Sequence, residues 1–166
     1  MKSQKISSKI TRTIDTSPSE CRIVTFSSSE FIMAVERFIN SHYRGLIALE
    51  VEYNAMGYID VSARCFAHFL KMLLSEIQAR REIYAKIKST KDFVGIAIDC
   101  GDVEVDFSKM FKIAEQGGFT LVKDKDSNLV NLYTPIKTTY YTNIYSMNPT
   151  GIYNTLVDVF AENFSE

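Results

Sequence analysis

Residues 93–105 read FVGIAIDCGDVEV. The first half is a nearly continuous apolar run, which predicts a strand that is covered on both faces, or on one face and an edge. The run ends at Asp99, and Gly101 can take the positive φ that a tight turn or a close ligand requires. A carboxylate there can hydrogen-bond a ligand amine, or it can form an Asx turn that only ends the strand. The sequence of this stretch leaves both interpretations open.

The composition is that of an ordinary globular protein. The chain has 166 residues, of which 46% are apolar and 23% charged, with a net charge of −1. This predicts one domain with a proper core and no generic affinity for nucleic acid or acidic membranes. Neither a bilayer-spanning apolar run nor a signal peptide is apparent, so we expect a cytoplasmic protein without membrane contact. The three cysteines are widely spaced, which predicts free buried thiols, a reducing setting, and neither a metal site nor a disulfide framework.

Short β-rich runs and helical periodicities alternate along the chain. Strands are predicted at residues 21–26, 46–53, 58–61, 93–99, 119–122, 129–133 and 138–145. Helices are predicted at residues 28–42, at 63–77 with a continuation or bend over 79–88, at 107–114, and from 149 onward. Ser27-Ser28-Ser29 offers an N-cap for the first helix and Ser62 one for the second, Asp106 can cap the third helix, and Gly117 and Gly118 end it.

This order of elements predicts an α/β (α+β) fold. Residues 46–61 and 119–133 have the pattern of hairpins, and helices alternate with them. We therefore expect a two-layer sandwich, with a mixed sheet and helices packed on one of its faces. The domain spans residues 21–136, after a leader at 1–20 that is mobile or a helix remnant. An extra strand and helix at residues 137–166 are predicted to pack on the domain.

Three stretches together resemble the ATP-binding domain of sensor histidine kinases, a member of the GHKL superfamily that includes gyrase. They are IALEVEYNAMGYIDVSARCFAHFLKMLLSEI at 47–77, FVGIAIDCGD at 93–102 and FSKMFKIAEQGGFTLVKDKDSNLVNLYTPI at 107–136. The resemblance implies that Asp99 contacts the adenine amino group beside Gly101. It also implies that Glu76 takes the place of the asparagine that holds magnesium.

Several positions depart from the family pattern. Met72 stands where the family has a polar residue, and Val103 replaces the second glycine of the Asp-x-Gly turn. The connection before Phe107 is too short for the ATP lid and its phosphate-cradling glycines. The resemblance therefore implies a vestigial nucleotide pocket of Asp99, Gly101 and Glu76. It assigns no catalytic residue, no cofactor, and no metal ligand except Glu76, whose carboxylate repels a triphosphate unless a metal intervenes.

The histidines do not complete a kinase. His42 and His68 both fall inside the ATPase-like domain, and we predict structural roles for both. We expect a degenerate histidine kinase-like domain that acts as a regulatory or binding module without phosphotransfer. The alternative is a divergent kinase domain that still binds ATP and magnesium and works with a partner carrying the acceptor histidine. A third interpretation is an unrelated α/β interaction domain, which a non-central strand at 93–99 would favour.

The C-terminal extension is rich in tyrosine, with Tyr140, Tyr141, Tyr145 and Tyr153. Such amphipathic rings pack at core edges and are common at interfaces. We therefore expect this extension to cover part of the domain, or to bind a protein partner or a second copy of the chain.

Overall fold

The computed structural model describes residues 22–54, 57–77, 82–101, 103–137 and 149–162. Its elements are β1 (Val24–Ser27), α2 (Ser28–His42), β2 (Ile47–Tyr53), β3 (Tyr58–Val61), α3 (Ala63–Ile77), β4 (Ile83–Ser89), β5 (Phe93–Asp99), α4 (Ser108–Gln116), β6 (Thr120–Lys123), β7 (Leu129–Pro135) and α5 (Pro149–Ala161). The predicted strand over 138–145 lies outside the described residues, as does the leader.

The central element is a five-stranded mixed sheet with the order β2-β4-β5-β7-β6. β2 and β4 are parallel, whereas the other neighbours are antiparallel. β5 is the middle strand, as predicted from its apolar run. A separate two-stranded sheet joins β1 and β3.

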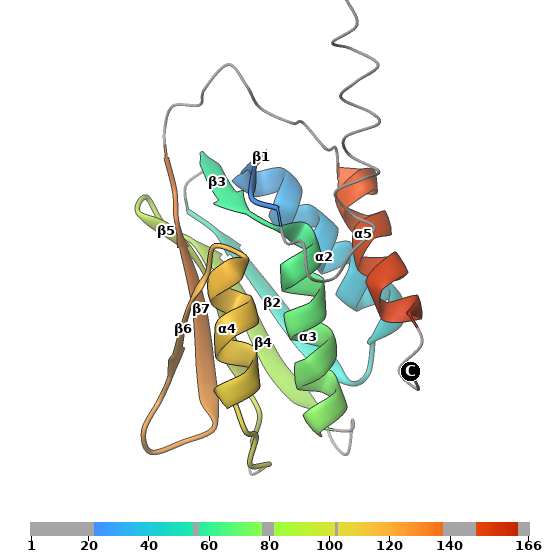
Figure 1. The fold of residues 1–166 in the computed structure, drawn as a ribbon, viewed down its shortest axis with the longest axis vertical. Coiled ribbons are helices and arrows are strands. Elements are labelled where there is room, and N and C mark those ends of the chain that lie inside the picture. The colour runs from blue at the N-terminus through green and yellow to red at the C-terminus, as the bar shows by residue number, and fades with distance from the viewer. Residues whose placement is uncertain (1–21, 55–56, 78–81, 102, 138–148, 163–166) are drawn as a thin grey trace, which may run out of the picture.

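The helices lie on one face of this sheet, which confirms the predicted fold class (Figure 1). The burial of side chains along β5 distinguishes the two faces of the sheet, because Val94, Ile96 and Ile98 are buried on one face whereas Asp99 is exposed on the other. Ile96 and Ile98 share an apolar gap with side chains of α2 and α3, so the helices cover this face. α5 packs on the outside of α2 and α3.

The predicted hairpin over residues 46–61 is wrong. β3 pairs with β1, in a register that sets Ser27 opposite Tyr58, while β2 pairs with β4. The chain instead passes close to the end of β7, where Tyr58 and Lys137 exchange two backbone hydrogen bonds of 2.8 Å. Gly57 permits this approach, because a Cβ atom there would lie 2.5 Å from the Lys137 carbonyl oxygen.

The predicted continuation of the long helix over residues 79–88 is also wrong. β4 occupies Ile83–Ser89, and Ile83, Ala85 and Ile87 are buried while Tyr84 is 63% exposed. The alternation of apolar and polar side chains therefore outweighs the helix propensity of lysine and alanine in this segment, because every second side chain packs into the core beneath the helices.

The cysteine prediction is wrong in one part. Cys65 is disulfide-bonded, and its partner lies outside the described residues. Cys100 is free and fully buried. Two distant stretches of sequence can bring cysteines together in the fold, so wide spacing did not exclude a disulfide.

Local signals for the helix ends are mostly confirmed. The Ser62 hydroxyl accepts a hydrogen bond of 3.0 Å from the backbone N–H of Cys65 at the start of α3. Gly118, which follows the C-cap residue Gly117 of α4, has φ +90°. Ser27 is the N-cap of α2, but its side chain makes no cap hydrogen bond.

Candidate functional site

The turn after β5 is built around the Asp99 carboxylate. Its Oδ1 accepts a hydrogen bond of 3.0 Å from the backbone N–H of Gly101, which has φ +68°. Asn128 fixes the turn from the β6–β7 loop, because its side-chain amide donates to the Gly101 carbonyl at 2.9 Å. This is the geometry of an Asx turn, and it uses one carboxylate oxygen within the chain.

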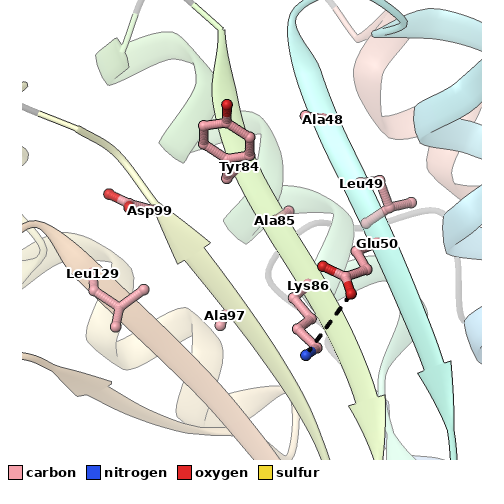
Figure 2. A pocket seen from close by; sticks show the side chains of 9 residues that line it. All are labelled: Ala48, Leu49, Glu50, Tyr84, Ala85, Lys86, Ala97, Asp99 and Leu129. Carbon is pink, nitrogen blue, oxygen red and sulfur yellow. Dashed lines mark ion pairs between the residues drawn. The ribbon is translucent and has the colours of Figure 1, made fainter.

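Asp99 lies on the sheet face that carries no helix. It pairs with Tyr84 on β4 and with Leu129 on β7, and all three line a shallow hollow of about 300 Å³. Figure 2 shows side chains of β2, β4, β5 and β7 around this hollow. The lining residues are Ala48, Leu49, Glu50, Tyr84, Ala85, Lys86, Ala97, Asp99 and Leu129.

Lys86 partly neutralises the carboxylates of Glu50 and Glu52 on this face. Lys86 Nζ lies 3.1 Å from Glu52 Oε1 and 4.0 Å from Glu50 Oε2. The hydrogen bond to Glu52 raises the pKa of Lys86, and its Coulombic attraction and that of Glu50 add to this. The pKa of Glu52 is lowered by hydrogen bonds from Asn54 and Lys86 and by the charge of Lys86. The charged residues that line the hollow are Glu50, Asp99 and Lys86, so its lining has one more negative than positive charge.

Glu76 and Met72 lie on the other side of the sheet. Both belong to α3, whose side chains Leu70, Leu73 and Leu74 face the helix-covered side of the sheet. Glu76 is exposed near the end of that helix. Asp99 and Glu76 therefore lie on opposite sides of β5, so the structure does not bring the predicted pocket residues together around one ligand. Of the predicted set, only Asp99 and Gly101 are in contact.

The short connection from β5 to α4 contributes to the core instead of covering a ligand. Val105 and Phe107 are 8% and 9% exposed, and Met110 in the first turn of α4 is 1% exposed. They belong to the same apolar cluster as Leu73 and Ile77 of α3. Residue 102 lies outside the described part.

The space between α2, α3 and the sheet is filled. The gap there measures about 10 Å³ and is lined by apolar side chains alone. A volume of this size holds about one water molecule at most. It offers neither space nor polar partners for a nucleotide.

Cys100 follows Asp99 but points into the core. Burial, with a smaller contribution from the Asp99 charge, raises the pKa of this thiol to about 11. A thiol of this kind stays protonated at neutral pH, so Cys100 is not a nucleophile.

Both histidines contact α5. His42 Nε2 lies 3.0 Å from the Tyr153 hydroxyl, at the exposed end of α2. His68 lies on α3, where burial lowers its pKa, while Glu162 opposes and Arg64 and Lys71 add to this shift. The two histidines lie on α2 and α3, whereas Asp99 faces the side of the sheet that carries no helix.

A cationic cluster on α3 was missed from the sequence. Arg64 and Lys71 are only 4% and 6% exposed. Their spacing from His68, at i, i+4 and i+7, was the available signal. What the sequence did not reveal is that α5 covers them.

Among the described residues, no group of three or more His, Cys, Asp and Glu side chains could hold a metal ion. No helix in the described part of the chain is long and apolar enough to cross a membrane.

No family model matches the chain, and no curated protein matches it. Solved structures do: the cytoplasmic segment of histidine kinase QseC is 9% identical, with a TM-score of 0.46 over 81% of this chain and 87% of that one. Acinetobacter baumannii histidine kinase AdeS is 11% identical, with a TM-score of 0.48 over 81% and 77%. The catalytic domain of histidine kinase ThkA is 12% identical, with a TM-score of 0.46 over 71% and 99%. All three structures are of histidine kinases, the family that the sequence resembles. At these identities and TM-scores, the similarity concerns the fold alone.

Proposed function

We propose that this chain is a regulatory or binding module with a histidine kinase-like fold, and that it does not transfer phosphate. The observation that supports this is the separation of Asp99 and Glu76 by the sheet. A nucleotide site needs its adenine ligand and its magnesium ligand on one side of the sheet, within the length of one ATP molecule.

The chemistry of phosphoryl transfer gives a second reason. The reaction depends on positioning and on neutralising the charge of the phosphates. In the described part of the β5–α4 connection, Val105 and Phe107 are buried where backbone N–H groups would have to surround phosphates. Without these donors, ATP and magnesium are not expected to be retained.

Titration calorimetry with Mg-ATP and with ADP tests the proposal. We expect no binding with a Kd below about 100 µM, which corresponds to roughly −5.5 kcal/mol. Incubation with ATP labelled at the γ-phosphate should likewise leave the protein unlabelled. Asp126→Asn, in the exposed β6–β7 loop, is the matched control for Asp99→Asn.

One result would overturn the proposal. If Mg-ATP binds in the micromolar range, and Asp99→Asn abolishes binding while Asp126→Asn does not, the chain is a nucleotide-binding kinase domain. A partner would then have to supply the acceptor histidine.

We also propose that the C-terminal extension stabilises the domain as a cover. Its support is that Ile152, Leu156 and Val159 of α5 are 0–1% exposed, and that α5 packs on α2 and α3. Removing residues 148–166 should expose this apolar surface, so we expect lower solubility or a new oligomeric state in size-exclusion chromatography. If the truncated protein keeps both the solubility and the oligomeric state of the full chain, the extension is neither a cover nor the interface of a dimer.

A further inference from the structure

Three basic side chains form a row on α3. Arg64, His68 and Lys71 are spaced so that they share one side of the helix. The side chains of Arg64 and His68 are 4% and 15% exposed, and Lys71 is 6% exposed. Long cationic side chains are rarely buried to this extent unless anionic or carbonyl oxygens receive them.

The oxygens come from the end of α5. Arg64 Nη2 forms an ion pair with Glu162 Oε2, and His68 Nε2 lies 3.9 Å from Glu162 Oε1. Lys71 Nζ donates to the carbonyl oxygens of Val159 and Glu162 at 2.8 and 2.9 Å. Lysine thus binds the C-terminal carbonyls of α5, whereas the arginine and the histidine share one carboxylate.

The Glu162 carboxylate does not satisfy every nitrogen donor around it. Arg64 Nε and His68 Nε2 are buried and have no hydrogen-bond partner. In the described part of the chain, the charges that face His68 are those of Glu162, Arg64 and Lys71, so two permanent cations face one anion. A buried nitrogen without a partner is costly, which indicates that the site suits a ligand with more oxygens and more negative charge.

We infer that Arg64, His68 and Lys71 form a binding site for a phosphoryl dianion, and that the Glu162 carboxylate occupies it when the ligand is absent. A dianion balances the two permanent cations. Its tetrahedral oxygens can accept from both edges of the guanidinium group and from the imidazole. The phosphoryl group can be free phosphate or a phosphorylated side chain of a partner protein.

Glu162 is placed to leave without disturbing the fold. It lies directly after the last residue of α5, and its side chain is 36% exposed. Rotation of this side chain into solvent frees Arg64 and His68, while Lys71 keeps the carbonyl oxygens that hold α5. The site therefore lies on the outer side of α3, away from Asp99, and does not depend on a nucleotide.

The test is an NMR titration of the full chain with inorganic phosphate at about pH 7.5, where the dianion prevails. The Arg64 Nε–H and His68 imidazole signals should shift with phosphate and not with nitrate at the same ionic strength. Glu162→Gln removes the competing charge, so we expect about tenfold tighter phosphate binding, which corresponds to ~1.4 kcal/mol. Lys86→Met, at an exposed cation on the sheet, is the matched control and should leave the titration unchanged.

Arg64→Lys keeps the charge but removes the planar fork, and it should weaken phosphate binding by about tenfold. A phosphoserine peptide, compared with its unphosphorylated form, distinguishes a partner's phosphate from the free ion. The inference is overturned if the Arg64 and His68 signals of Glu162→Gln do not respond to either probe, or respond equally to nitrate. Should Arg64→Lys fail to fold, the wild-type and Glu162→Gln titrations still decide.

Discussion

Asp60 on β3 and Lys137, two residues beyond the end of β7, form an ion pair in which Nζ and Oδ2 are 2.5 Å apart. The other oxygen, Oδ1, accepts a hydrogen bond of 2.6 Å from the Thr25 hydroxyl on β1. Tyr58 and Lys137 also form an isolated β-bridge beside this pair. The two-stranded sheet is therefore joined to the main sheet by one carboxylate and one backbone bridge.

We expect Asp60→Asn to lower the free energy of unfolding by about 0.5–1.5 kcal/mol, because a partly exposed ion pair is screened by solvent. Burial raises the pKa of Asp60, but hydrogen bonds from Lys137 and Thr25 outweigh it, so the pKa is lowered. The stabilisation is thus present above the unfolded-state pKa of about 4 and is lost as pH falls through the folded-state pKa. Urea unfolding of both proteins at neutral and acidic pH checks this. The difference between them should shrink in acid, and a constant difference would contradict the prediction, as would an equal effect of Asp126→Asn.

Gly118 and Gly45 both have φ +90°, but their surroundings differ. A Cβ atom at Gly118 would lie 2.5 Å from the Asp60 carbonyl oxygen, whereas nothing lies within 4 Å of one at Gly45. We expect Gly45→Ala to cost about 1–2 kcal/mol from backbone strain alone. Gly118→Ala should cost more than that, since the backbone of β3 must also move. Thermal unfolding of the two variants measures the difference, and equal losses would show that the contact with β3 relaxes freely.

Much of the fold could be predicted because local signals agreed with the core. The strand at 93–99 has a continuous apolar run, and it is the middle of the sheet. Gly118 and Ser62 end and begin helices where turn and cap chemistry predict it. The β6–β7 hairpin follows from a polar loop between two β-rich runs.

The errors arose where pairing is not local. β3 follows β2 in sequence, but the close approach of Gly57 to Lys137 directs it to β1. The run IYAKIK contains helix-forming residues as well as an alternating apolar pattern. It forms a strand because β2 and β5 pair with it on both sides, and β2 is distant from it in sequence. For the candidate site, the Asx turn at Asp99 was one of two interpretations that the sequence left open, and the sequence could not show which side of the sheet the carboxylate faces.

The cysteines should differ sharply in their chemistry. Cys65 is disulfide-bonded, and Cys100 is a buried thiol whose pKa is raised to about 11, mainly by burial. Under non-reducing conditions we expect the native protein to resist alkylation by iodoacetamide at pH 8, as followed by mass spectrometry. Reduction should lower the free energy of unfolding by about 2–4 kcal/mol. Cys100→Ser keeps the disulfide and should lose the same stability on reduction, whereas Cys65→Ser lacks it, so the stability of that control should not depend on the reductant. Rapid alkylation before reduction would show that a thiol is exposed.

Asp99 itself distinguishes a turn residue from a ligand-binding residue. Its Oδ1 accepts from the Gly101 N–H at 3.0 Å, and an asparagine side-chain oxygen can accept the same hydrogen bond. We therefore expect the free energy of unfolding of Asp99→Asn to lie within about 0.5 kcal/mol of the wild-type value. Asp99→Ala should have a free energy of unfolding about 0.5–1.5 kcal/mol lower than the wild type. Equilibrium unfolding in urea gives both values, with Glu76→Gln on exposed α3 surface as the control. A carboxylate held for ligand binding gives the opposite order, because its removal relieves a cost to the free protein, and Asp99→Ala would then be at least as stable as the wild type.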